Sequence, residues 1–325
     1  MTRARKELIN PLHAGSYHLI TRCVRRERLL DRGERKVWLC RGMAHWLSHM
    51  GIDLLAYAIM GDHLHVVIRL RPELVEGWSE AEVVRHALAV MPEHSGPGLE
   101  PLRVAPAVLA RYAGNAKWVS LQRKRLSSPS WLLRMVKQEI AHRANAEDGC
   151  RGHFWESRFS SVVLLDAAAT LACMVYVDLN PFRARLVKDP TKSLFTSIRH
   201  RQARVQGARS KSNALDSDLG KCLVAMPQCG PINRRSSKQE AWSLSESDYV
   251  SLVRETATLG KRSGRVAVSQ AFAVVQQLGI KPAAWAAAMA QGGSMGGCVL
   301  GSPEARQRWC KSVGQSWAAD KSGLW

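Results

Sequence analysis

Hydrophobic and polar residues follow two different periodicities in the first 70 residues. Residues 17–23 alternate with a period of two, which predicts a strand, whereas residues 33–50 place apolar side chains at helical spacing. Residues 52–60 and 63–70 are apolar runs on either side of Gly61-Asp62, a dipeptide typical of a tight turn. These two runs therefore predict a β-hairpin.

A second group of elements follows a proline-punctuated stretch, residues 72–128, in which only a helix at about 79–90 can be assigned. Residues 130–145 have the pattern of an amphipathic helix, and residues 159–165 that of a short strand. A further helix at 167–179 should end at Asn180-Pro181, because a residue that precedes proline disfavours helical backbone angles.

The order of these elements indicates the fold class. Strand, helix, strand, strand, helix, strand, helix predicts an α+β fold, in which a small antiparallel sheet carries its helices on one face. The second half of the chain predicts mainly helices, at 244–259, 266–278, 283–290 and 303–317.

Charge narrows the classes of partner. Among 325 residues, 47 are Lys or Arg and 27 are Asp or Glu, so the formal net charge of +20 favours nucleic acid as a partner. No apolar run approaches the ~20 residues of a membrane-spanning helix, and the first residues lack the apolar segment of a secretory signal. We therefore expect no membrane association and a cytoplasmic, nucleoid-associated protein.

Histidine divides the chain into two parts. All 11 histidines lie in residues 1–200, and residues 199–238 are rich in Arg, Lys, Ser, Gly and Gln, a composition typical of a linker or a basic arm. We therefore predict a catalytic domain at 1–205, with 72–128 as an insertion, and a basic linker with a helical region at 206–325. That second region is expected to bind DNA or a protein partner, with neither alternative favoured.

The candidate chemistry begins with His63 and His65. On a strand these two imidazoles face the same way, within reach of one metal ion, while Leu64 and its alternate neighbours face a core. A His-x-His pair is a weak signal, because two structural histidines would give the same pattern. Tyr176 and Asn180 stand four apart on one helix face and could supply a nucleophile and an oxygen ligand. A core tyrosine followed by a helix-ending asparagine is the alternative.

Four ordered blocks together resemble the single-tyrosine HUH transposases, and most closely the REP-associated tyrosine transposases. They begin at Tyr17-His18, at Ala56 (AYAIMGDHLHVVI), at Gly149 (GCRGHFWESRF) and at Tyr176 (YVDLNPFRAR). The resemblance covers about residues 12–200. It departs from the family where Asp62 replaces an asparagine that is common before the first histidine, and where 72–128 is longer than in compact members.

The resemblance implies a ferredoxin-like fold and a metal-dependent endonuclease that transfers strands of single-stranded or hairpin DNA. Tyr176 would form a 5′-phosphotyrosine, and Mg²⁺ or Mn²⁺ would be held by His63, His65 and Asn180. Such a transposase catalyses DNA transposition, a form of DNA recombination. The possibility of a homodimer stays open.

Basic and aromatic residues are candidates for contacts with DNA, since cations neutralise phosphates and aromatic rings stack on bases. The candidates are Arg22, Arg25, Arg26, Arg123, Lys124, Arg125, Trp155 and Arg158. The alternative is that the tryptophans belong to the core and the arginines to a solvated face.

Two other functions compete with the transposase. A catalytically silent DNA-binding regulator or architectural protein of the same fold would have no need of the histidine pair together with Tyr176. A zinc hydrolase would need a third His or Cys ligand at useful spacing, and none is evident.

Overall fold

The computed structural model describes residues 8–90, 106–207, 217–226, 244–259, 270–290, 297–316, 318 and 322–325. Its centre is a five-stranded sheet in the order β2-β3-β1-β4-β5. The strands are β1 (Gly15–Arg22), β2 (Ile52–Ile59), β3 (His63–Leu70), β4 (Ser160–Leu164) and β5 (Val299–Leu300). The first four pair antiparallel in the ferredoxin-like order, and β5 adds a parallel strand beside β4. The predicted hairpin and the α+β class are therefore confirmed.

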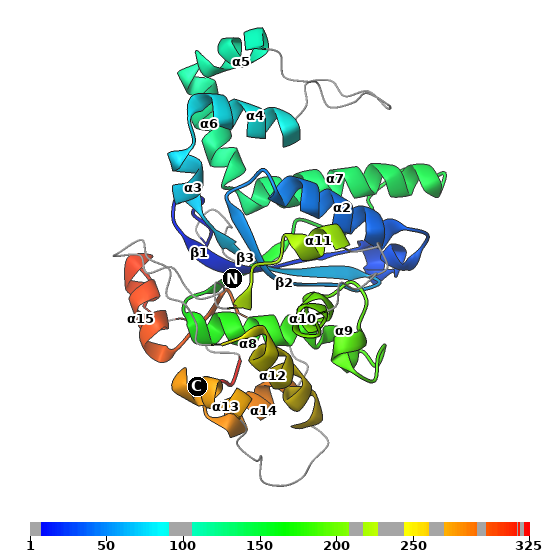
Figure 1. Ribbon diagram of the computed structural model, residues 1–325, viewed down its shortest axis with the longest axis vertical. Helices are drawn as coiled ribbons and strands as arrows, with labels where there is room; N and C mark the ends of the chain where they lie inside the picture. The colour runs from blue at the N-terminus through cyan, green and yellow to red at the C-terminus, as the bar shows by residue number, and fades with distance from the viewer. Residues whose placement is uncertain are drawn as a thin grey trace.

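One face of the sheet packs against two long helices, α2 (Arg35–Leu47) and α7 (Pro129–Glu147). Leu64, Val66 and Ile68 of β3 point into this layer and are buried with the apolar side chains of both helices (Figure 1). The alternation of β3 thus produces the core face that its sequence predicts.

The opposite face of the sheet is also covered, which corrects the prediction of helices on one face only. Helix α8 (Ala167–Asp178) packs against β2 and β3 through a second buried cluster that includes Ala58 and Val67. Residues 168–178 of this helix are all buried, so it is apolar around its whole circumference. Such a helix needs cover on every side, and a sheet alone cannot provide that cover.

Further helices complete that cover. Helix α10 (Ser197–Val205) packs against β2 beside α8, and α12 (Glu246–Leu259) contacts both α8 and α10. Helices α13 (Gln270–Gln277) and α14 (Pro282–Ala290) pack against α12 (Figure 1). The short elements in this half are α9 (Asn180–Arg183), η3 (Pro190–Lys192), α11 (Ser217–Lys221) and α15 (Pro303–Ser312). The predicted helical C-terminal region is present.

Residues 72–90 and 106–128 form a helical projection at one end of the molecule (Figure 1). Its described helices are α3 (Pro72–Gly77), α4 (Glu80–Val90), α5 (Pro106–Ala113) and α6 (Ala116–Leu126). Two short 3-10 turns, η1 (Val24–Arg26) and η2 (Leu29–Asp31), follow β1. No helix among the described residues is both long and apolar enough to cross a membrane.

Candidate active site

The hairpin presents His63 and His65 on the face of the sheet that α8 covers. Their ring centroids lie 4.8 Å apart. His65 is buried, whereas the side chain of His63 keeps 15% exposure. The structure therefore places the two sequence-predicted histidines side by side, with the outer one open to solvent.

A neighbouring side chain engages the Nδ1 atom of each histidine. Asp62 Oδ1 lies 2.6 Å from His63 Nδ1, and His18 Nε2 lies 2.9 Å from His65 Nδ1. Both Nε2 atoms are thereby left for another partner, as happens at metal sites where an outer residue orients a ligand histidine. Asp62, the departure from the family's usual asparagine, therefore acts as a carboxylate partner for His63.

Burial keeps these imidazoles neutral. Desolvation lowers the pKa of His63 and the pKa of His65, and it lowers the pKa of His18 to about 3. For His63 the neighbouring Asp62 opposes this shift. A neutral imidazole has one nitrogen with a free lone pair, which is the form that binds a metal ion.

Tyr176 of α8 lies beside the histidines. The centroid of its ring is 6.0 Å from that of His65 and 6.1 Å from that of His18. The Arg183 guanidinium carbon stands 4.1 Å from the centroid of the Tyr176 ring. Burial lowers the pKa of Arg183, while the charge of Tyr176 and a hydrogen bond to it act in the opposite direction. Helix α8 thus brings the predicted nucleophile to the histidine pair, and Arg183 of α9 gives it a cationic neighbour.

Asn180 follows Tyr176 by one helical turn, as the sequence spacing predicts. Its Nδ2 donates to the carbonyl oxygens of Tyr176 and Val177, at 3.0 and 3.4 Å. No described residue donates to its side-chain oxygen. The amide is therefore oriented with its oxygen available as a ligand.

The donor set fits a divalent ion that also binds the substrate. Within the described ranges, no group of three His, Cys, Asp or Glu side chains could hold a metal, so the zinc hydrolase has no supporting site there. His63 Nε2, His65 Nε2 and the Asn180 oxygen would provide two nitrogens and one oxygen, which leaves room for phosphate oxygens. Mixed nitrogen and oxygen donors suit Mn²⁺ as well as the harder Mg²⁺.

Contacts from the C-terminal half fix the helix that carries Tyr176. The buried carboxylate of Asp178 accepts hydrogen bonds from the hydroxyl groups of Ser197 and Tyr249 and from the backbone N–H of Ile198. Burial raises the pKa of this carboxyl to about 6, although these hydrogen bonds act against the shift. Tyr249 belongs to α12, so this carboxylate joins α8 directly to the C-terminal region.

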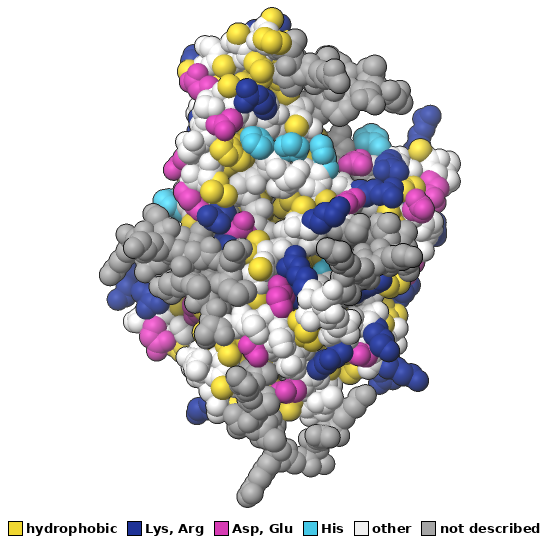
Figure 2. Space-filling model, viewed as in Figure 1, with side chains coloured by type: hydrophobic (Ala, Val, Ile, Leu, Met, Phe, Trp, Pro, Cys, Tyr) yellow, Lys and Arg dark blue, Asp and Glu magenta, His cyan; other side chains and the backbone are white. Residues whose placement is uncertain are grey.

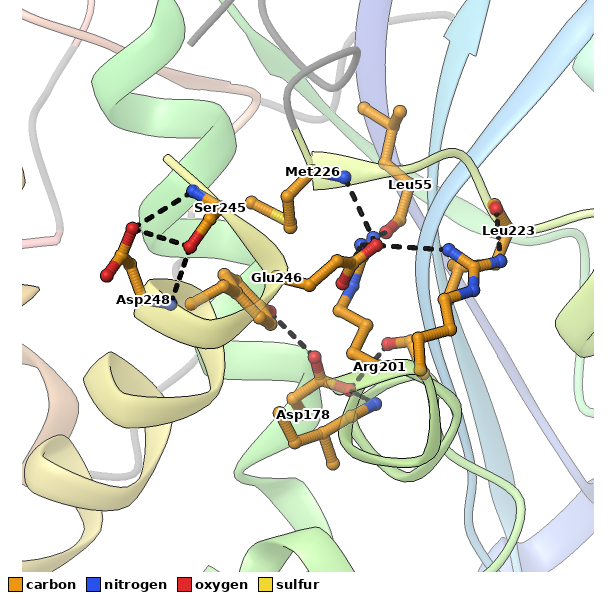
Figure 3. A network of polar contacts seen from close by, with 12 residues as sticks. Leu55, Asp178, Arg201, Leu223, Met226, Ser245, Glu246 and Asp248 are labelled. Carbon is orange, nitrogen blue, oxygen red and sulfur yellow. Dashed lines mark hydrogen bonds and ion pairs between the residues drawn. The ribbon is translucent and has the colours of Figure 1, made fainter. Parts of the chain in front are cut away.

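A second contact in the same network joins α10 to α12 (Figure 3). The buried guanidinium of Arg201 pairs with Glu246 at 3.0 Å and donates to the Leu55 carbonyl oxygen of β2 at 2.7 Å. Ser245 and Asp248 cap the start of α12 by reciprocal hydrogen bonds. Helix α12 is therefore held on both the sheet and α8.

Three predicted DNA contacts lie at the end of β1 next to the histidines. Arg22 pairs with His63 in the sheet register, and Arg25 and Arg26 are exposed. Both exposed residues have left-handed backbone angles, with φ of 53° and 58°. In the view of Figure 2, the Lys and Arg side chains of the described residues lie among Asp and Glu side chains.

The three consecutive basic residues before α7, Arg123 to Arg125, have different surroundings. Arg123 donates to the carbonyl oxygens of Val75 and Trp78, so its guanidinium holds α3 and α6 together. Lys124 is exposed. Arg125 lies 4.4 Å from the centroid of the Trp131 ring. Contact with DNA stays a prediction for all three, and Arg123 has a structural task besides.

Trp155 and Arg158 line a cavity of about 640 Å³. Its wall also includes Trp131, Arg134 and Lys137, so aromatic rings and cations share one hollow. Trp155 is only 7% exposed, and its indole N–H donates to the Lys137 carbonyl oxygen. An isolated backbone β-bridge between Trp155 and Cys23 holds the segment around Trp155 against the end of β1, beside Arg22. The cavity therefore adjoins the strand that carries the predicted phosphate contacts.

Sequence reasoning missed the roles of His18, Asp62 and Arg183 at this site. Each lies in a block that resembles the transposases, so the signal was present. Their partners, however, depend on contacts between strands and across a helix end that a linear pattern does not show.

Part of the chain is similar to a known family. Residues 12–75, about a fifth of the chain, match the family model described as IS200-like transposase. The matched segment contains β1, α2 and the histidine hairpin and ends before Tyr176.

A solved structure described as a REP-associated tyrosine transposase bound to a REP hairpin has 14% sequence identity and a TM-score of 0.38. That similarity covers 63% of this chain and 87% of the other. No curated protein matches the chain.

Proposed function

We propose that this protein is an IS200-like transposase that acts as a single-tyrosine DNA endonuclease and strand transferase, with Tyr176 as the nucleophile. The observation that carries the proposal is the packing of the Tyr176 ring against His18 and His65, at 6.1 and 6.0 Å between centroids.

The chemistry is an exchange of phosphodiester bonds. The Tyr176 oxygen attacks the scissile phosphorus, the bond from phosphorus to the 3′ oxygen breaks, and a 5′-phosphotyrosine forms. The phenol loses its proton to solvent, and the departing 3′ oxygen takes one up. A 3′-OH of another strand then attacks the phosphotyrosine and restores the phenol. Because the energy of the broken phosphodiester bond is retained in the phosphotyrosine, strand transfer needs no nucleotide cofactor.

Arg183 helps the phenol to react. A tyrosine phenol has an unperturbed pKa of about 10, so at neutral pH it is a poor nucleophile without a nearby positive charge. The Arg183 guanidinium carbon lies 4.1 Å from the centroid of the Tyr176 ring, where its positive charge would offset negative charge at the reacting groups. His63, His65 and Asn180 would hold Mg²⁺ or Mn²⁺, which when bound polarises the phosphate and offsets its developing charge.

The substrate would be single-stranded or hairpin DNA. The net charge of +20 supports a polyanionic partner, and the same charge favours association with the nucleoid. Arg22, Arg25 and Arg26 lie beside the histidines, where they would receive the phosphates on one side of the scissile bond. Trp155 and Arg158 line the adjoining cavity.

A cleavage assay on single-stranded DNA with a hairpin, in the presence of Mn²⁺, tests the proposal. Tyr176→Phe keeps the ring and removes the attacking oxygen, so cleavage should disappear while DNA binding remains. Tyr112→Phe is the matched control, because the Tyr112 ring packs at a tilt against Trp118 in the projecting helices, away from the histidines. Binding without cleavage by the wild type would instead support a silent regulator, and cleavage by Tyr176→Phe would exclude this nucleophile.

A further inference from the structure

A buried imidazole stands behind one of the two proposed ligands. His18 of β1 and His65 of β3 are 1% and 2% exposed, and their rings stack with centroids 5.1 Å apart. His18 pairs with Val67 in the sheet, so it is the diagonal neighbour of His65 on the same face. The other residues next to it on this face, Val67 and Val162, are apolar. A histidine at this position therefore calls for an explanation other than packing.

The contact between the two rings allows only two arrangements of protons. A single hydrogen joins His65 Nδ1 to His18 Nε2, at 2.9 Å. When His65 Nδ1 carries that hydrogen, its Nε2 keeps a lone pair and can bind a cation. When His18 Nε2 carries it, the proton of neutral His65 must stand on Nε2, which blocks the ligand position. The acceptor role of His18 is thus the one compatible with a metal at His65.

The remaining nitrogen of His18 supports the same conclusion. In the metal-compatible arrangement, the His18 proton lies on Nδ1, which has no hydrogen-bond partner among the residues that the structure describes. The edge of the Tyr176 ring closes the space beside both imidazoles. A buried imidazole with one nitrogen that lacks a hydrogen-bond partner destabilises the fold. Such a cost is expected where the other nitrogen, here Nε2, serves a function.

We propose that His18 is a positioning residue, which accepts the Nδ1 hydrogen of His65 and directs His65 Nε2 toward a divalent cation. This rests on the proposed function, which places the cation at His63 and His65. The two proposed ligands then have different hydrogen-bond partners at Nδ1: the Asp62 carboxylate for His63 and the neutral His18 imidazole for His65. A neutral acceptor fixes the tautomer of His65 without adding negative charge at a buried position.

Binding of Mn²⁺ to the full-length protein, followed by electron paramagnetic resonance, tests the proposal. His18→Phe keeps a flat ring but removes the acceptor, so the affinity for Mn²⁺ should fall by about 10- to 100-fold. His18→Gln restores an acceptor oxygen and should bind Mn²⁺ more tightly than His18→Phe. His142→Phe changes an exposed histidine of α7 and should leave the affinity unchanged. Wild-type affinity in a folded His18→Phe protein would overturn the proposal.

Nitrogen-15 NMR of the wild-type imidazoles provides a measurement that does not depend on a variant's folding. His65 should be protonated at Nδ1 and His18 at its own Nδ1. Protonation of His65 at Nε2 would overturn the proposal. A wild-type protein that shows this tautomer and binds Mn²⁺ but cleaves no DNA would contradict the proposed function and leave the role of His18 intact.

Discussion

The two halves of the candidate site are held in place by different parts of the chain. The sheet half, His18, His63 and His65, lies on two neighbouring strands, within residues 15–70. The helix half, Tyr176 with Asn180 and Arg183, depends on groups much further along. Tyr249 bonds to Asp178 of α8, and the Met289 carbonyl oxygen accepts from Arg183 at 3.3 Å. The histidines are thus held in place by the pairing of β1 with β3, whereas Tyr176 is held in place by contacts with the C-terminal region.

This difference bears on the predicted domain boundary near residue 205. The boundary follows composition, and it stays a prediction. Across it, however, β5 pairs with β4, and α12 and α14 share one buried cluster with α8. We therefore expect the C-terminal region to be required for the structure of the catalytic helix.

Truncation after residue 205 should have the largest effect. It removes Tyr249, Leu252 and Val253, all fully buried in the cluster around α8. Each is worth about 1.5–3 kcal/mol, against a total stability of about 5–15 kcal/mol for a typical domain. The truncated chain should lack a cooperative thermal transition. In contrast, full-length Tyr249→Phe, which loses one hydrogen bond worth about 1–3 kcal/mol, should stay folded. A truncated protein that folds and cleaves DNA would show that the helix half needs no support.

A smaller effect is expected from pH, through Asp178. Its pKa is raised to about 6, so the folded protein binds this proton more tightly than the unfolded chain does. The free energy of unfolding should therefore fall as pH rises from about 4 to about 6, and level off above that range. The resulting decrease in the free energy of unfolding should be about 3 kcal/mol.

Asp178→Asn isolates this contribution. The amide oxygen can still accept from Ser197 and Ile198, and the amide nitrogen can donate to the Tyr249 oxygen. Urea unfolding between pH 4 and 7 should show a shallower decrease for Asp178→Asn than for the wild type. Identical pH profiles would mean that Asp178 is not the group that links stability to pH in the helix half.

The smallest effect concerns Arg25 and Arg26, which extend the sheet half toward solvent. Replacing both with alanine should weaken binding to single-stranded DNA and lower the slope of log affinity against log salt by ~1.4, at ~0.7 for each lost phosphate contact. Because both side chains are exposed, the free energy of unfolding should change by less than about 0.5 kcal/mol. An unchanged salt slope would remove these residues from the DNA interface.

The same contrast explains how much the sequence could predict. Strand alternation placed His63 and His65 on one face, and Asn180-Pro181 marked the end of α8. The start of this helix is also set by a local contact, since Asp166 accepts from the backbone N–H of Ala169 at 2.8 Å. These signals are local, so a linear pattern contains them.

The rest depends on contacts between distant segments. The partnership of His18 with His65 follows from strand register, and the support of Asp178 by Tyr249 joins residues 71 positions apart. The cover on the second face of the sheet was missed for a related reason. An apolar helix signals that it is buried, but it does not signal which elements surround it.

Mass spectrometry of the trapped complex is the most direct test of the proposal that Tyr176 becomes covalently attached to DNA. The full-length protein, incubated with hairpin-bearing single-stranded DNA and Mn²⁺, would be digested with nuclease and protease and its peptides sequenced. We expect a nucleotide phosphate on the Tyr176 oxygen. A nucleotide attached to any other residue, or cleaved DNA without a protein adduct, would contradict it.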